Sequence, residues 1–295
     1  MKWQGRRRSD NVTDARGQTV SGGGRGMGGL PMIINFVLRL FGVKGLLVVG
    51  VLGVIAWQMG IIDPATLLGG GGGQVQQVDY QPSAEEEQLY NFVEVVLADT
   101  EDVWTREFQR IGRSYVKPEL VIYRTRHQTA CGMGDARMGP FYCPADQKIY
   151  IDLSFYNELA RSFDAPGDFA QAYVIAHEVG HHVQTLLGIS RQVAERRGQP
   201  DYKQYSVRLE LQADFLSGLW AHHNRHYLEA GDIEEAMRAA NQIGDDAIQS
   251  RTQGRINPHA FTHGTSEQRM RWFMKGFESG QIEDSDTFKQ PYERL

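Results

Sequence analysis

The chain has 295 residues and 41% of them are hydrophobic, so it is long enough to bury the core of one large domain or of two small ones. Its formal net charge of -5 at pH 7 argues against a general nucleic-acid-binding protein, which would carry an excess of basic residues. The charge is unevenly distributed, because the basic side chains clearly outnumber the acidic ones in the first 44 residues.

Residues 1–29 form a polar arm that is rich in arginine and glycine. This composition predicts a disordered, cytoplasmic segment, because such a sequence cannot bury enough apolar surface to fold by itself. Taken alone, the basic residues could contact nucleic acid or anionic lipid. The apolar sequence that follows favours lipid, so we expect no nucleic-acid partner.

Residues 30–62 are assigned to a membrane, with a transmembrane helix at about 45–62. The stretch 45–62 contains no formally charged residue and has about the minimum length that crosses a bilayer core of roughly 30 Å. A buried helix of a globular domain is the alternative. Four glycines would weaken such a helix in water, namely Gly45, Gly50, Gly53 and Gly60.

The basic residues lie on the N-terminal side of this stretch, and Asp63 follows it. The positive-inside rule therefore places the N-terminus in the cytoplasm and the bulk of the chain beyond a single crossing. A cleaved signal peptide fits less well, because the apolar run begins late and no small-x-small cleavage site follows it. Residues 63–80 contain the glycine run 69–73 and are predicted to be a flexible tether to a domain at 81–295.

Cys131 and Cys143 are the two cysteines of the sequence. A pair without a spare thiol suits an oxidising compartment, and the glycine-rich segment between them can close a loop, so we predict a disulfide bond. Two reduced, unpaired thiols are the alternative. A zinc site built on both cysteines is disfavoured, because the CxxC spacing is missing.

The domain at 81–295 is predicted to be mostly helical with a small mixed β-sheet, an α+β fold. Ser83 can cap a first helix, and a second is expected from about Thr100 to Gly112. Strands are expected at 120–123, 141–143 and 148–152. A strand at the rim of the sheet could pair with an extended peptide substrate or could be part of a purely structural hairpin, and the sequence favours neither.

Further helices are predicted from apolar residues at helical spacing and from capping residues. The first runs from Phe169 to Leu187 with Asp168 as its cap. The second begins at Ser206 and the third at Asp232. The last follows Thr265-Ser266-Glu267-Gln268, a sequence that fits a capping box.

The helix from Phe169 to Leu187 contains a His-Glu-x-x-His sequence, His177-Glu178-Val179-Gly180-His181. His177 and His181 are one turn apart on the same helix face, where two neutral imidazoles can bind one Zn²⁺. Glu178 is placed to act on a water molecule at the metal. A polar helix face without a metal is the alternative. His182 points to another face, and we do not expect it to be a ligand.

A catalytic zinc site needs a third protein ligand and an open position. The next helix offers Glu210 and Asp214, one turn apart among apolar residues. We predict that Glu210 is the third ligand and that Asp214 accepts a hydrogen bond from a ligand histidine. The alternatives for the third ligand are Glu195, His222, His223 and His226. A solvated acidic helix face is the interpretation without a metal.

His177-Glu178-x-x-His181 together with Glu210-x-x-x-Asp214 resembles the gluzincin arrangement of thermolysin-like zinc peptidases, although the segment between the two motifs is longer than in thermolysin. The whole chain, including the stretch His263-Gly264-Thr265-Ser266, resembles the bacterial membrane-anchored neutral zinc metallopeptidases. The resemblance implies a zincin-like peptidase domain with one Zn²⁺ per chain. With the topology argument, it implies a single-pass protein of the bacterial inner membrane with a cytoplasmic N-terminus and a periplasmic domain.

The expected function is therefore that of a membrane-tethered zinc peptidase with Glu178 as the general base. A developing oxyanion needs a further donor, for which His263 is the leading candidate, ahead of Arg269 and Tyr227. The expected partners are a protein or peptide substrate and the lipid bilayer. The alternative function is a catalytically weak zinc-binding module that binds envelope proteins or peptides.

Overall fold

A computed structural model describes residues 1–20 and 75–295 of the chain. The predicted transmembrane helix at 45–62 lies outside these residues, and among the helices within them none is both long and apolar enough to span a bilayer. The chain divides into two compact units. Unit 1 consists of Met1–Gly17 and Asp79–Leu295, and unit 2 of Gln18–Val78. In unit 2, β2 (Gln18–Val20) pairs antiparallel with β3 (Val75–Gln77).

Unit 1 contains a four-stranded sheet with the strand order β1-β4-β8-β7. The strands are β1 (Val12–Asp14), β4 (Glu119–Tyr123), β7 (Phe141–Cys143) and β8 (Lys148–Asp152). β4 pairs in parallel with both β1 and β8, whereas β7 pairs antiparallel with β8. The sheet is therefore mixed, as predicted, and β7 is an edge strand.

The two faces of this sheet enter two separate clusters of buried side chains. Alternate residues of β4 and β8 point into the main core, as the two-residue period of a strand requires: Leu120, Ile122, Ile149 and Ile151. The opposite face contributes Val121, Tyr123 and Tyr150 to a smaller cluster with Cys143. A hairpin of β5 (Arg126–Thr129) and β6 (Gly132–Asp135) lies beside it, with the ring of His127 at 5.6 Å from that of Tyr150.

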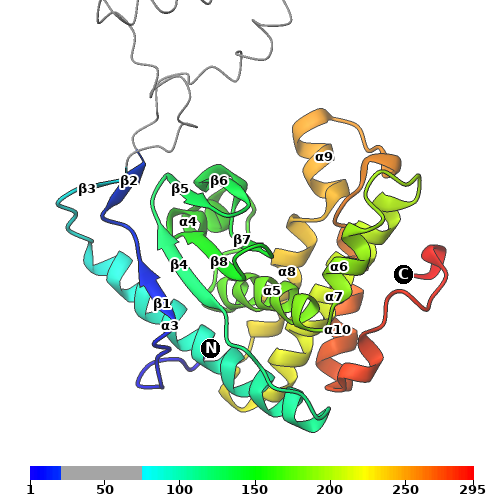
Figure 1. The fold of residues 1–295 in the computed structure, drawn as a ribbon, viewed down its shortest axis with the longest axis horizontal. Coiled ribbons are helices and arrows are strands. Elements are labelled where there is room, and N and C mark those ends of the chain that lie inside the picture. The colour runs from blue at the N-terminus through cyan, green and yellow to red at the C-terminus, as the bar shows by residue number, and fades with distance from the viewer. Residues whose placement is uncertain (21–74) are drawn as a thin grey trace, which may run out of the picture. The chain divides into compact units, whose positions relative to one another are not determined.

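One helix, α5, is in contact with both the sheet and the helical part of unit 1. It touches α3, α7 and α8 as well as β7 and β8, and Figure 1 shows it between the sheet and the other helices. The helices of unit 1 are α3 (Ala84–Arg110), α4 (Ser154–Arg161), α5 (Asp168–Leu186), α6 (Ile189–Ala194), α7 (Tyr202–His223), α8 (Asp232–Gln242), α9 (Asp245–Gln253) and α10 (Ser266–Ser279). The fold is thus mostly helical α+β, as the sequence indicated.

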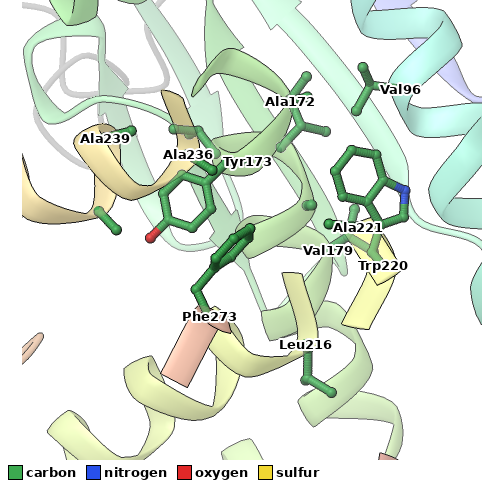
Figure 2. Close-up of a cluster of buried hydrophobic side chains, with 14 of the residues drawn as sticks. Val96, Ala172, Tyr173, Val179, Leu216, Trp220, Ala221, Ala236, Ala239 and Phe273 are labelled. Atoms are coloured by element: carbon green, nitrogen blue, oxygen red, sulfur yellow. The ribbon is translucent and has the colours of Figure 1, made fainter. Parts of the chain in front are cut away.

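The main core fixes α5 from several sides (Figure 2). The ring of Phe273 on α10 meets the ring of Tyr173 on α5 edge to face, with 5.5 Å between the centroids. On another side, Trp220 of α7 stacks on Phe169 of α5 at 5.8 Å. Aromatic side chains of this size bury large apolar areas, so α5 cannot shift without disrupting the core.

Two predictions about the helices are wrong, in both cases because of contacts with residues that are distant in the sequence. Residues 84–110 form one helix instead of two, because the polar stretch at Asp99 and Glu101 is bound by arginines from the arm and does not interrupt the helix. Asp168 does not cap α5, since its carboxylate accepts a hydrogen bond from the amino group of Met1 at 2.7 Å. The capping box at Thr265 is confirmed.

The prediction of a disordered arm at residues 1–29 is wrong for Met1–Gly17, which is part of unit 1. β1 pairs with β4, and Trp3 packs edge to face against Phe92 at 5.5 Å. Composition misled here because the charges of the arm are matched by carboxylates that lie far away in the sequence. The folded domain therefore includes more than 81–295.

Candidate metal centre

The two histidines of the His-Glu-x-x-His sequence and Glu210 come together at the contact between α5 and α7. The Oε2 atom of Glu210 lies 3.3 Å from Nε2 of His177 and 3.5 Å from Nε2 of His181. The imidazole centroids are 4.8 Å apart, and the three ligand atoms all lie within 4.8 Å of one another. The structure thus brings together the three predicted ligands.

Gly180 explains how α7 can approach α5 so closely. A Cβ atom on Gly180 would lie 3.1 Å from the carbonyl oxygen and 3.2 Å from the Cα of Ala213. A larger side chain would push the two helices apart at the level of the metal centre. The helix-propensity cost of glycine, about 1 kcal/mol relative to alanine, is therefore accompanied by a packing advantage.

Each ligand histidine has a hydrogen-bond partner on its Nδ1 atom. Nδ1 of His177 lies 2.8 Å from Oδ1 of Asp214, and Nδ1 of His181 lies 2.9 Å from Oε1 of Gln184. Both partners are oxygen acceptors, so each imidazole donates from Nδ1 and keeps the lone pair of Nε2 free for a metal. Asp214 therefore lies where it was predicted. The role of Gln184 was not predicted, although its i+3 spacing from His181 could have indicated it.

Asp214 is fully buried and accepts hydrogen bonds from three side chains on two helices, α5 and α10. Besides His177, it accepts from the hydroxyl of Tyr173 at 2.6 Å and from Nε and Nη2 of Arg269 at 2.9 and 3.0 Å. Burial alone would raise the pKa of Asp214, but the charges of Arg269 and His177 outweigh it and hold the pKa at about 2. Asp214 is therefore a permanent anion behind His177.

The ligand cluster has the electrostatics of a cation site. Burial lowers the pKa of His177, but Asp214 and Glu210 overcome this effect and raise it to about 9. For Glu210, burial is outweighed by His181 and His263, so its pKa lies well below the usual value. In the absence of a metal, the cluster holds protons between its nitrogen and oxygen atoms. A metal ion would displace those protons, so its affinity should increase with pH.

Glu178 lies beside these ligands at the wall of a cavity of about 500 Å³. Its side chain is 8% exposed, and burial raises its pKa, although the neighbouring His181 and His177 act in the opposite direction. A carboxylate whose pKa is raised towards neutrality is suited to accept and return a proton.

The opposite wall of the cavity is formed by the segment that leads into the edge strand β7. Residues 137–142 all line the cavity, together with Phe155 and Phe163. The predicted disulfide between Cys131 and Cys143 is confirmed, and it closes the loop that carries these residues. The edge of the sheet therefore faces the candidate ligands across the cavity.

His263, the predicted oxyanion donor, also lines this cavity. Its Nδ1 atom lies 3.3 Å from Oδ1 of Asp245, whose other oxygen accepts the backbone N–H groups of Thr262, His263 and Gly264. The charge of Glu210 raises the pKa of His263, with burial acting against it and Asp245 in support. Its side chain is half exposed, so it is accessible to a substrate.

The other candidates from the sequence have different partners. Glu195 pairs with Arg191 at 3.0 Å, His223 lies 3.4 Å from Glu107, and Nδ1 of His222 lies 2.7 Å from the carbonyl oxygen of Phe277. His226 stacks on Tyr227, which lies under the guanidinium of Arg6. Arg269 lines the cavity but its side chain is buried against Asp214.

Two imidazole nitrogens and one carboxylate oxygen are the protein ligands of a catalytic zinc ion with an open fourth position. Hydrogen bonds at Nδ1 orient both histidines, and the carboxylate of Glu178 lies beside them to act on a metal-bound water. These residues therefore fit a catalytic zinc ion. Residues 1–288 match the family described as "Putative neutral zinc metallopeptidase". The chain belongs to this family. The resemblance seen in the sequence is thereby confirmed.

Relatives of the chain are found in Escherichia coli and in Mycobacterium bovis. The "Uncharacterized protein YpfJ" of Escherichia coli K12 is 47% identical over 293 residues, which cover 98% of this chain and 99% of the relative. The "Uncharacterized protein Mb2605" of Mycobacterium bovis is 40% identical over 187 residues, or 59% of this chain and 63% of the relative. No solved structure matches the chain.

Proposed function

We propose that this protein is a zinc-dependent peptidase that hydrolyses peptide bonds with one Zn²⁺ per chain. The observation that carries the proposal is the convergence of His177, His181 and Glu210 beside the carboxylate of Glu178, in a cavity bounded by a sheet edge. A purely structural zinc site would close its fourth position with another cysteine or histidine. Among the described residues, the metal-ligand cluster at this cavity contains His177, His181 and Glu210 only.

The residues of the chain have separate roles in this proposal. His177, His181 and Glu210 would hold the ion, which supplies positive charge that polarises a carbonyl group and acidifies water. Glu178 accepts a proton from the attacking water and returns it to the leaving amine. His263 would donate to the oxygen on which negative charge develops. Asp214 and Gln184 keep the two ligand imidazoles in one tautomer.

The cavity supports an extended peptide as the substrate. Among the described residues, β7 is an edge strand of this sheet and pairs with β8 on one side only. A peptide that adds to this edge would form backbone hydrogen bonds and lie across the cavity in front of Glu178. The aromatic side chains of Phe141, Phe155 and Phe163 on the cavity wall favour apolar groups beside the cleaved bond.

We further propose that the apolar residues 30–62 attach the protein to the bacterial inner membrane and that the metal centre faces the periplasm. The disulfide Cys131–Cys143 supports an oxidising compartment for unit 1. The length and composition of residues 45–62 support contact with lipid.

The test uses the full chain, purified in detergent. We expect about one zinc per chain and cleavage of a mixed peptide library. Glu178→Gln should keep the zinc and lose activity by roughly 100-fold or more, because the variant removes the proton acceptor without removing a ligand. His177→Ala should lose the zinc, which can be measured by elemental analysis.

Glu195→Gln is the matched control. Glu195 is an exposed carboxylate at the C-terminal end of α6, so its replacement should leave both the zinc content and the cleavage rate unchanged. Stoichiometric zinc with no cleavage of any peptide would instead favour the binding module that captures peptides without hydrolysing them. Full zinc occupancy in His177→Ala would contradict the ligand assignment itself.

A further inference from the structure

The arm Met1–Gly17 is a structural part of the metallopeptidase fold. Three residues of β1 lie opposite Leu120, Val121 and Ile122 of β4. Backbone hydrogen bonds extend this ladder at both ends, from Leu120 N–H to Asn11 O at 2.9 Å and from Ala15 N–H to Ile122 O at 2.8 Å. β1 therefore makes β4 an internal strand, and without it the buried strand β4 would become an open edge.

The basic side chains of the arm are bound by carboxylates of α3. Arg6 pairs with Asp99, Arg7 lies 3.1 Å from Glu101, and Arg16 lies 2.7 Å from Glu87. Glu101 is 1% exposed and also accepts hydrogen bonds from Ser9 and Asn11. Removal of these partners would leave the charge of Glu101 buried and unpaired, which strongly destabilises a folded protein. The stability of α3 therefore depends on the arm.

These pairs change the meaning of the N-terminal charge. The positive-inside rule counts basic residues within about 15–20 residues of the ends of a membrane segment. Arg6, Arg7 and Arg16 lie farther than that from the stretch 45–62, and they pair with carboxylates of α3. They therefore do not indicate that the arm stays in the cytoplasm while the domain is exported.

The path of the chain then restricts its topology. The chain leaves unit 1 at Gly17 and returns to it at Asp79. Gln18 pairs with Gln77 and Val20 with Val75, so the outgoing and returning strands run side by side. A single crossing between Gly17 and Asp79 would place a bilayer core of roughly 30 Å between β1 and β4. Paired strands lie about 4.8 Å apart. A chain that crosses the bilayer once between Gly17 and Asp79 therefore cannot also pair β1 with β4.

We infer that the arm Met1–Gly17 and the metal centre lie on the same side of the membrane, which excludes a single crossing of the bilayer between Gly17 and Asp79. The inference rests on the proposed membrane attachment and is independent of the proposed catalysis. It replaces the expected cytoplasmic N-terminus, whereas the proposed periplasmic position of the metal centre is kept.

The first experiment compares two exposed positions of unit 1 in the full chain. Gln4→Cys lies in the arm and Arg197→Cys follows α6, and each variant is treated with a membrane-impermeant maleimide in intact spheroplasts and after lysis. Both cysteines should show the same pattern. Labelling of one position in intact spheroplasts, with the other labelled only after lysis, would overturn the inference. The chain without either substitution measures the background from Cys131 and Cys143.

The second experiment tests the strand pairing in the membrane-bound protein. The Oγ1 atom of Thr13 lies 2.6 Å from Oε1 of Glu119, so Thr13→Cys with Glu119→Cys should be joined by a short bifunctional thiol reagent. A protease site introduced at Gly69–Gly73 then separates the arm from the domain unless they are cross-linked. We expect a full-length band after proteolysis. Complete separation, equal to that of the control pair Thr13→Cys with Arg197→Cys, would overturn the inference.

Discussion

The two ligand histidines differ in what holds them. His177 donates to Asp214, a buried anion that is itself bound by Arg269 and Tyr173, whereas His181 donates to the neutral amide of Gln184. A charged acceptor increases the basicity of a ligand imidazole more than a neutral one does. Gln184 is in turn fixed by the carbonyl oxygen of Leu209 at 2.7 Å, so both α5 and α7 orient His181.

His263 gives a prediction at the residue scale. His263→Asn should lower kcat about 100-fold with a small change in KM, because a donor to a developing oxyanion acts in the transition state. Without a metal, the pKa of His263 is raised, mainly by the charge of Glu210. When a bound metal takes up that charge, the contact with Asp245 still favours the donating imidazolium form. Activity should therefore fall as the pH rises through this raised pKa, and a pH profile of kcat should lose that alkaline limb in the variant.

His259→Asn is the matched control, because His259 is exposed on the segment preceding His263 and does not line the cavity. Its kcat and pH profile should equal those of the unsubstituted protein. An unchanged alkaline limb in His263→Asn would show that another group controls it.

The ligand residues could be predicted because their arrangement is local. The i, i+4 spacing in a helix determines the positions of His177 and His181, and the same spacing places Glu210 and Asp214 on one face. The contact between these two faces is tertiary. For the same reason Arg269, which was considered only as an oxyanion donor, could not be recognised as the buried partner of Asp214.

At the scale of elements, α7 and α10 approach each other closely enough for their backbones to be in contact. A Cβ atom on Gly218 of α7 would lie 2.0 Å from the carbonyl oxygen of Phe273, and one on Gly276 of α10 would lie 2.0 Å from that of Phe215. The two glycines allow the backbones of the helices to touch. This contact positions Arg269, which lies on α10, behind the metal centre.

Gly218→Ala should destabilise the protein by about 3 kcal/mol, because the added methyl group collides with backbone atoms that cannot rotate away. Gly180→Ala is the control, since its Cβ atom would approach Ala213 only to 3.1 Å. The gain of about 1 kcal/mol in helix propensity should offset much of that strain. The free energies of unfolding can be compared by denaturant titration. Equal stability of both variants would contradict the close helix contact.

Periodicity and capping residues predicted most of the elements around the site. The strands at β4, β7 and β8 and the capped start of α10 are found where the sequence placed them. The short helix α9 and the hairpin β5–β6 were not predicted. α9 has few apolar residues, and the hairpin has neither alternating apolar residues nor a turn-forming pair such as Asn-Gly in its two-residue loop, Ala130-Cys131. Tertiary contacts determine these segments more than local sequence does.

For the whole molecule, the folded domain consists of two stretches of sequence joined by residues 18–78. Val20 and Val75 face each other at the described ends of β2 and β3, so a two-residue Asn-Gly turn can replace residues 21–74 in a type I′ hairpin. This variant should fold without detergent, bind zinc and retain peptide cleavage. Release from the membrane can be followed by fractionation.

The fragment 81–295 is the comparison. It lacks β1 and also Arg7, Ser9 and Asn11, which bind Glu101, while Lys117 remains. The loss of a partner of a buried charge costs about 3–5 kcal/mol, so thermal unfolding of the fragment should occur at a clearly lower temperature. If the fragment were as stable as the turn-linked variant, the arm would contribute nothing to the fold. The sequence could not reveal this dependence, because the pairing of β1 with β4 joins residues more than 100 positions apart.

The parallel pairing of β1 with β4 also has a consequence for assembly. β1 is held by non-covalent contacts and is connected to the rest of unit 1 through residues 18–78, a length of chain that could reach a neighbouring copy. Exchange of arms between two copies would recreate the same ladder and the same ion pairs without any new interface. Domain swapping of this kind is a low-cost route to dimers. The arm that completes one folded domain is thus chemically equivalent to the arm of its neighbour.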